Sequence, residues 1–351
     1  NAPPVGLMDG GIIDNIGISS FLTGNTWFMY YNQFLGNAIL IENEASETGL
    51  SSNNINAIAK IIRAKGMFEL SSIWGEIPFT QALVGAEFPS PQFDDQETVF
   101  RGCVDILDEA MALIDAMEPE GNFDVSAGDL IYGGNMDNWR RWANSIKLRI
   151  LMLIRNQDTG VDSQIAESLS EPLIEDISQA ALVRYKDTPA ESNAYNRLVE
   201  AFFGIGNEEQ DVYAPGPVLY NLLSESGDPR FGVLIADGPD GPPEMGTFAV
   251  EGEANISNNV IRNDLPHIMY LPSEVNLYKA ELALKGVSAA GDATDAYKMG
   301  VRQAIQFWGQ DIPGAIITVS TEDIDAYVDG LSDPSLEDVY NELYLESFIR
   351  P

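Results

Sequence analysis

The sequence has very few of the side chains that usually carry catalysis or bind transition metals. Cys103 is its single cysteine and His267 its single histidine among 351 residues. One cysteine excludes an internal disulfide framework, and one cysteine with one histidine excludes the usual zinc sites. Cys103 recurs with apolar residues at helical spacing, which predicts a small core residue. His267 has no G-x-S-x-G motif beside it, so we predict a packing or hydrogen-bonding role.

Basic residues are also scarce. The chain has 19 Lys and Arg against 54 Asp and Glu, a formal net charge of −35. This balance argues against a nucleic-acid partner and against docking on anionic lipid, because both need a basic face. Our preferred interpretation is that the acidity keeps the protein soluble. The composition does not exclude neutral ligands, cations or basic partners. The sequence contains no run of 18 apolar residues, so no segment is predicted to span a bilayer.

Carboxylates are too numerous for the sequence to single out a catalytic pair. A glycosidase needs two of them about 5 to 10 Å apart, and no spacing in the chain points to such a pair. We therefore predict no enzyme and no catalytic residue. Calcium, which prefers oxygen ligands, is the one cofactor left open, with Asp237, Asp240, Asp323 and Asp325 as candidates. Neither the segment 237–241 nor the segment 323–325 matches an EF-hand loop. Our preferred interpretation is therefore that these carboxylates are solvated and bind no calcium.

Helical patterns dominate what is present. In residues 138–155, Trp139, Trp142, Ile146 and Ile150 form one apolar stripe, and five cations lie in the same span. A cationic helix in so acidic a chain is expected to lie among acidic neighbours. Further helices are predicted at 18–41, 53–70, 96–117, 161–170, 217–226, 273–286, 292–309, 321–330 and 335–348, and also at 173–185 and 190–203.

The helices suggest antiparallel pairs. Small residues such as Ala280, Ala283 and Gly300 would let helices 273–286 and 292–309 approach closely, and 321–330 with 335–348 reads as a second pair. Helices 53–70 with 96–117, and 136–156 with 161–170, are candidates for two more. Residues 204–266 differ, since their Gly and Pro content predicts loops and short strands.

Five segments, taken in order, resemble one known family. They are Trp-Gly-Glu-Ile-Pro-Phe-Thr-Gln-Ala at 74–82, Pro-Gln-Phe-Asp-Asp-Gln at 91–96, the helix at 107–115, Trp-Arg-Arg-Trp-Ala-Asn-Ser-Ile-Lys-Leu-Arg at 139–149, and the helix pair over 274–304. Together they resemble the SusD/RagB-like nutrient-binding outer-membrane lipoproteins of Bacteroidetes.

The resemblance implies an all-α fold, a right-handed superhelix of tetratricopeptide-like helix pairs with a loop-rich insert. It implies one domain over 1–351, with the helical scaffold at about 18–203 and 267–351 and the insert at about 204–266. It also implies a lipoprotein at the cell surface, anchored in the outer membrane by an N-terminal cysteine that this chain does not contain. Such a protein captures oligosaccharides or polysaccharides for a TonB-dependent (SusC-like) transporter barrel.

Sugar binding calls for exposed aromatic rings, because pyranose rings present apolar C–H faces that stack on them. The candidate ligand-binding residues are Trp27, Tyr30 and Tyr31, the loop residue Trp74, and Tyr213 and Tyr270. Trp139, Trp142 and Trp308 lie on apolar helical faces and are predicted to be core. The preferred function is glycan capture. The alternatives are a protein-binding tetratricopeptide-like scaffold without sugar affinity and a surface enzyme that acts on polysaccharide.

Overall fold

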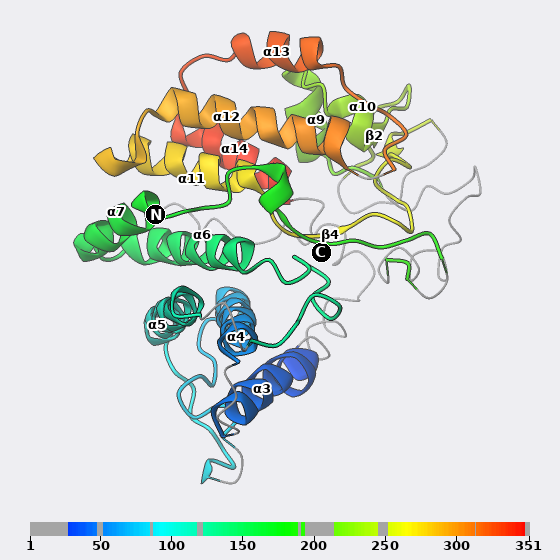
Figure 1. Ribbon diagram of the computed structural model, residues 1–351. Helices are drawn as coiled ribbons and strands as arrows, with labels where there is room; N and C mark the ends of the chain where they lie inside the picture. The colour runs from blue at the N-terminus through cyan, green and yellow to red at the C-terminus, as the bar shows by residue number, and fades with distance from the viewer. Residues whose placement is uncertain are drawn as a thin grey trace. The chain divides into compact units, whose positions relative to one another are not determined.

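The computed structural model describes residues 27–47, 52–84, 87–117, 122–188, 191–193, 214–244, 252–312 and 314–347. These residues form two compact units, unit 1 up to Ile174 and unit 2 from Glu175 onward. The predicted all-α class is confirmed, since helices make up most of the described residues (Figure 1). None of the described helices is long and apolar enough to cross a membrane. The single-domain assignment stays a prediction.

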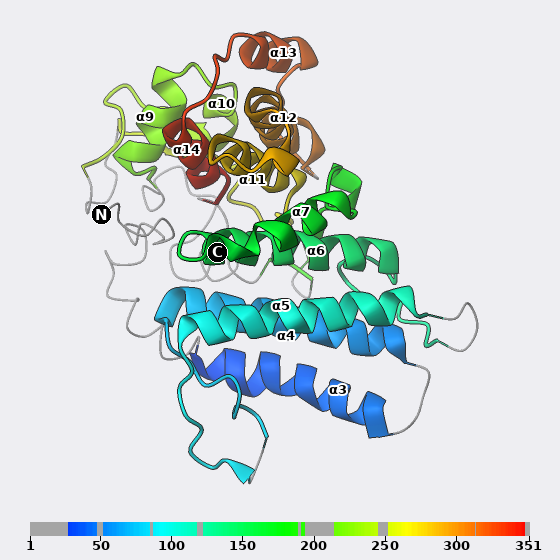
Figure 2. The ribbon, with the colours of Figure 1, turned by 90° about the vertical axis from the view of Figure 1, so that its left-hand side faces the viewer.

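Unit 1 is a stack of helices. A π-helical turn η1 (Tyr30–Leu35) leads into α3 (Gly36–Glu47), and the long helices α4 (Asn53–Trp74), α5 (Gln96–Asp115) and α6 (Met136–Arg155) follow. A short 3-10 turn η3 (Thr159–Val161) leads into α7 (Asp162–Ser170). Helix α4 packs against α3 on one side and α5 on the other, and α6 packs against α5 and α7 (Figure 2). The two pairs predicted in this half of the chain are therefore present.

Helix α6 is held by its apolar stripe and by the acidic neighbours expected for it. Trp139 and Trp142 are buried, as predicted. The Arg140 guanidinium lies 2.7 Å from an Asp115 oxygen, and the Lys147 ammonium lies 2.6 Å from Asp108 on α5. Cys103 is buried in the core of the same unit, and burial raises the pKa of its thiol to about 12. The prediction that it is a core residue is confirmed.

The Asn-Ser step of α6 joins this helix to the segment that follows. The Asn144 amide donates to the Ser168 carbonyl at 2.9 Å, and the Ile174 amide N–H donates to the Ser145 hydroxyl at 3.0 Å. Both side chains are buried. Buried polar groups are tolerated when they are hydrogen-bonded, so these two residues fix how α7 and its exit pack on α6.

Unit 2 combines helices with two small antiparallel sheets, β1 with β4 and β2 with β3. His267 lies on β4 opposite Val183. The helix predicted at 173–185 is wrong, because this stretch forms a 3-10 turn and then β1. The elements are η4 (Ile177–Gln179), β1 (Ala181–Val183), α9 (Pro217–Glu225), α10 (Phe231–Leu234), β2 (Ile235–Ala236), β3 (Asn255–Ile256), β4 (His267–Tyr270), α11 (Pro272–Leu284), η5 (Ser288–Ala290), α12 (Ala293–Gln306), η6 (Phe307–Asp311), α13 (Thr321–Asp329) and α14 (Leu336–Ser347).

The close pairing of α11 with α12 is confirmed. A Cβ on Gly300 would lie 2.9 Å from the Leu277 side chain, so only glycine allows this approach. The second predicted pair is corrected. Helix α13 packs mainly against α12 and α14 mainly against α11, because apolar faces of both find partners in the first pair.

A buried ionic cluster links α14 to the turn before α10. Arg230 is 1% exposed, and its guanidinium lies 2.6 Å from an Asp228 oxygen and 2.6 Å from a Glu342 oxygen. Glu346 lies 3.7 Å away and accepts a 2.6 Å hydrogen bond from the Ser273 hydroxyl. One cation thus faces three carboxylates inside unit 2.

Candidate ligand-binding site

Four aromatic rings meet at the C-terminal end of α4, and we call Trp27, Tyr31, Trp74 and Phe93 the aromatic cluster. Trp27 is its centre. Its ring centroid lies 5.0 Å from that of Tyr31 and 5.4 Å from that of Trp74, which it meets edge to face. Phe93 stacks on Trp27 at 6.1 Å with an interplanar angle of 18°. Three segments distant in the sequence supply these rings.

The π-helical turn positions the first of these segments. Its wider hydrogen bond runs from the Gly36 amide to the Tyr31 carbonyl, and such turns are frequent at functional sites. The Tyr31 hydroxyl donates to the Pro78 carbonyl at 2.7 Å, which ties the turn to the loop after α4. Gly66 of α4 lies under the turn, and a Cβ there would come within 2.8 Å of the Phe34 ring. The turn is therefore held from two sides.

Asp94 joins the other two segments. It forms an isolated antiparallel bridge with Ile77, and its carboxylate accepts the Phe79 and Thr80 amides at 3.0 and 2.7 Å. Phe93 precedes it directly, so these bonds hold the Phe93 ring near the loop that follows Trp74. The Phe79 ring in turn packs over Gly102, where a Cβ would lie only 2.3 Å from a ring carbon.

The cluster is open to solvent. Phe93 is 59% exposed, and Phe28 next to Trp27 is 57% exposed. Ile73 beside Trp74 is exposed as well, while Trp27 and Trp74 themselves are half-buried. Large apolar side chains exposed to water are unfavourable in the free protein, and at an aromatic cluster such exposure is typical of a binding surface.

Carboxylates border the cluster. The Tyr30 hydroxyl donates to Glu69 at 3.0 Å, and burial together with Glu69 raises the pKa of Tyr30. Burial and the charge of Asp94 likewise raise the pKa of Tyr31. Glu76, two residues beyond Trp74, is exposed. Both tyrosine hydroxyls therefore stay protonated at neutral pH. Asp94 places a negative charge beside Tyr31, whereas the charge of Glu69 beside Tyr30 is paired with Lys65.

Three of the six predicted site residues, Trp27, Tyr31 and Trp74, come together in the cluster. Tyr30 lies beside it but turns to Glu69 and to the Phe34 ring. Tyr213 lies outside the described residues. Tyr270 is corrected to a core position, because only 2% of it is exposed and a sugar cannot reach its ring.

Phe93 was missed, although it stands in the Pro-Gln-Phe-Asp motif. Nothing local in the sequence shows that this phenylalanine faces solvent, and Trp27 lies 66 positions before it.

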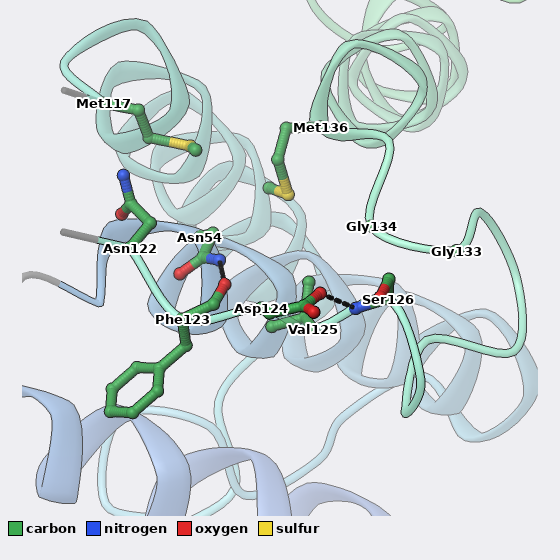
Figure 3. Close-up of a pocket in the computed structure, with 10 residues that line it drawn as sticks. All are labelled: Asn54, Met117, Asn122, Phe123, Asp124, Val125, Ser126, Gly133, Gly134 and Met136. Atoms are coloured by element: carbon green, nitrogen blue, oxygen red, sulfur yellow. Dashed lines mark hydrogen bonds between the residues drawn. The ribbon is translucent and has the colours of Figure 1, made fainter. Parts of the chain in front are cut away.

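A separate hollow of about 340 Å³ lies at the opposite end of α4 (Figure 3). The Asn54 amide donates to the Phe123 carbonyl at 2.7 Å on its wall, and Met117 and Met136 also line it. The Phe123 ring, 47% exposed, points away from the two methionines. Helix α4 has 22 residues and is about 33 Å long, so the hollow and the aromatic cluster are distinct sites. The hollow offers polar groups but no ring that faces into it.

Three of the four calcium candidates are engaged in other interactions. Asp237 accepts the Tyr220 hydroxyl at 2.9 Å, Asp323 belongs to the cap of α13 with Ser320, and Asp325 pairs with Arg302. Among the residues that the structure describes, no three His, Cys, Asp or Glu side chains are grouped to hold a metal ion. The expectation of no cofactor, with structural calcium left open, stays untested.

Comparison with known proteins gives the family. A family model described as "Starch-binding associating with outer membrane" matches residues 17–350. The chain belongs to the SusD-like family. The predicted resemblance is thereby confirmed, and membership makes this a binding protein of a family associated with the outer membrane. No curated protein matches the chain.

Solved structures share the SusD-like fold. A chitin-binding protein superposes with a TM-score of 0.78 at 24% identity, over 92% of this chain and 72% of the other. A putative outer-membrane protein from Bacteroides vulgatus, described as probably involved in nutrient binding, superposes with a TM-score of 0.73 at 22% identity. The match covers 92% of this chain and 75% of the other. A SusD homolog from Bacteroides fragilis superposes with a TM-score of 0.72 at 21% identity, over 93% of this chain and 75% of the other. At these identities the likeness shows the fold.

Proposed function

We propose that this SusD-like protein captures a glycan on its aromatic cluster at the outer-membrane surface and delivers it to a TonB-dependent transporter barrel, with no bond made or broken. The observation that carries the proposal is the aromatic cluster, in which exposed Phe93 stacks on half-buried Trp27 and Trp74 meets Trp27 edge to face, in a family described as starch-binding. The fold neighbour described as chitin-binding supports the same ligand class.

The chemistry of the cluster suits a sugar. The rings offer apolar faces for C–H groups, and their edge-to-face and stacked contacts with one another keep them in place. The segment between α4 and α5, which carries Phe93, also carries the amide side chains of Gln81 and Gln92 and the exposed Thr80. Amides and hydroxyls both donate and accept, as sugar hydroxyls do. Stacking and directed hydrogen bonds together are what binds a neutral glycan.

Calorimetry against a panel of neutral oligosaccharides tests the proposal. At least one of them is expected to bind, and Phe93→Ala or Trp27→Ala is expected to weaken it at least tenfold, since truncation of a central aromatic typically costs about 2 kcal/mol or more. Phe123→Ala is the matched control, because it removes another exposed ring at the far end of α4. The proposal fails if no glycan binds, or if the control weakens binding as much as the cluster variants.

The transporter step has its own support and test. Leu40 and Ile41 are adjacent on α3 and both exposed, and exposed apolar side chains suit a protein contact. Leu40→Glu with Ile41→Glu is expected to reduce co-purification of the barrel while sugar affinity stays unchanged. Co-purification with no sugar affinity in the native protein would favour the protein-binding scaffold instead.

Enzymatic action on polysaccharide is tested directly. Purified protein incubated with the glycan that it binds is expected to release no reducing ends. Release of reducing ends that is lost on a single Asp or Glu substitution would establish a hydrolase and overturn the non-enzymatic proposal.

A further inference from the structure

We infer that the aromatic cluster selects uncharged glycans and excludes polyanionic ones, such as sulfated or uronate-rich polysaccharides. The inference rests on the proposed function and adds the charge class of the ligand. It depends on two features of unit 1, namely how its cations are used and which charges border the cluster.

Most cations of unit 1 are paired with carboxylates of the protein. Sulfate and carboxylate groups are recognised mainly by Arg and Lys, often through two parallel hydrogen bonds. Seven of the nine described Lys and Arg residues of unit 1 lie within 4 Å of an Asp or Glu oxygen, and the other two, Arg141 and Arg149, contact the Leu173 carbonyl and the Phe68 ring. The seven are Lys60, Arg63, Lys65, Arg101, Arg140, Lys147 and Arg155.

Lys65, whose carboxylate partner also bonds Tyr30 beside the cluster, illustrates this. Lys65 pairs with Glu69, the same carboxylate that accepts the Tyr30 hydroxyl. Lys65 is also largely covered, with 13% of its side chain exposed. An incoming sulfate would have to displace Glu69 to reach the ammonium group, so Lys65 does not offer a site for an anion.

The charges that remain at the cluster are negative. Asp94 is fixed next to Tyr31 by its bonds to the Phe79 and Thr80 amides and to the Thr80 hydroxyl. Glu76 is exposed two residues beyond Trp74. An anionic polymer that stacked on Trp27 and Phe93 would bring its own charges close to these carboxylates and be repelled at low ionic strength. A neutral polymer meets no such repulsion, and its hydroxyls can donate to the same oxygens.

Matched polymers that differ only in charge test the inference. The pairs are dextran and dextran sulfate, starch and carboxymethyl starch, and hydroxyethyl cellulose and carboxymethyl cellulose. Calorimetry at 20 and 300 mM NaCl is expected to show binding to the neutral member of at least one pair. The charged polymer of that pair should bind at least tenfold more weakly than the neutral one at 20 mM NaCl, and this difference in affinity should be smaller at 300 mM. Equal or tighter binding of the charged member at 20 mM overturns the inference and leaves the proposed function standing. Failure of every neutral polymer and every oligosaccharide overturns both.

A charge-reversal variant tests whether the exclusion is local. In Glu76→Lys, the ratio of the affinity for the neutral polymer to that for its charged partner is expected to fall at least threefold, while affinity for the neutral polymer stays within twofold. Glu167→Lys on α7 is the matched control, because it makes the same charge change at an exposed position of the same unit. If both variants lower this ratio equally, the carboxylates at the cluster are not responsible and the inference is wrong.

Discussion

The aromatic cluster of unit 1 exposes apolar side chains, and the ionic cluster of unit 2 buries charged ones. Proteins usually bury apolar side chains and expose charged ones. Unit 1 leaves Phe93 more than half exposed beside Trp27, whereas unit 2 buries Arg230 almost completely with Asp228 and Glu342. Exposed rings and buried charges are each unfavourable unless something compensates. For the rings we propose a ligand outside the chain; for the charges the partners are inside it. The difference separates a binding region from a structural one.

The largest expected effect is at Arg230. Replacing it with Met leaves Asp228, Glu342 and Glu346 buried without their cation, which typically costs about 3–5 kcal/mol. Urea unfolding followed by circular dichroism should show this loss. Arg302→Met is the control, because its pair with Asp325 is partly exposed and such pairs contribute roughly 0–1 kcal/mol. Similar losses in both variants would mean that burial of the Arg230 cluster is energetically unimportant.

Substitution of one buried glycine in each unit allows a direct comparison of the two units. In Gly66→Ala the new Cβ meets the Phe34 ring at 2.8 Å, and in Gly300→Ala it meets Leu277 at 2.9 Å. Each is expected to destabilise the protein by about 1–3 kcal/mol through overpacking. Gly66→Ala should in addition weaken glycan binding, since it shifts the turn that carries Tyr31. Calorimetry after a check of folding measures this. Equal effects of the two variants on affinity would contradict the division between the units.

The ionic cluster also predicts a pH dependence. Burial and the charges of Asp228 and Glu346 outweigh the attraction of Arg230 and raise the pKa of Glu342 from its usual 4.5 to about 7. Between these values the folded state holds a proton that the unfolded state has released, so stability falls as pH rises from about 4.5 to 7. The slope approaches at most about 1.4 kcal/mol per pH unit.

Denaturant unfolding across this pH range, in the native protein and in Glu342→Gln, measures the slope. The variant carries a neutral side chain at every pH and should lose most of the dependence. An unchanged slope in Glu342→Gln would assign the effect to another group. Glycan affinity is expected to be unaffected by the substitution, because the aromatic cluster belongs to the other unit.

The smallest effect compares two tyrosines. Tyr31→Phe removes the hydroxyl that donates to the Pro78 carbonyl, which is worth about 0.5–1.5 kcal/mol of stability, and loosens one ring of the cluster. A twofold to fivefold loss of glycan affinity is expected. Tyr270→Phe should leave affinity within twofold because Tyr270 is buried in unit 2. A larger loss for Tyr270→Phe would restore it as a ligand-binding residue.

Particular elements show how far sequence reasoning reaches. The α6 pattern predicted its buried face and acidic surroundings correctly, because both follow from helical spacing and charge. The strand Ala181–Val183 was predicted as helix, because a short apolar run does not distinguish the two. Helices α13 and α14 were predicted correctly, but their partners were not, since several apolar faces were available to each.

The chain by itself determined most of its helices, its acidic charge and its SusD-like family, since all three depend on residue type and spacing along the sequence. The helix predicted at 173–185 was wrong, and the one predicted at 190–203 lies almost wholly outside the described residues. Which rings face water was decided only by tertiary structure. Tyr31 and Tyr270 have the same side chain, yet one lies in the aromatic cluster and the other is sealed in a core. Phe93 joins Trp27 only because Asp94 bridges to Ile77. Exposure depends on which distant segments pack together, and local sequence carries no record of that.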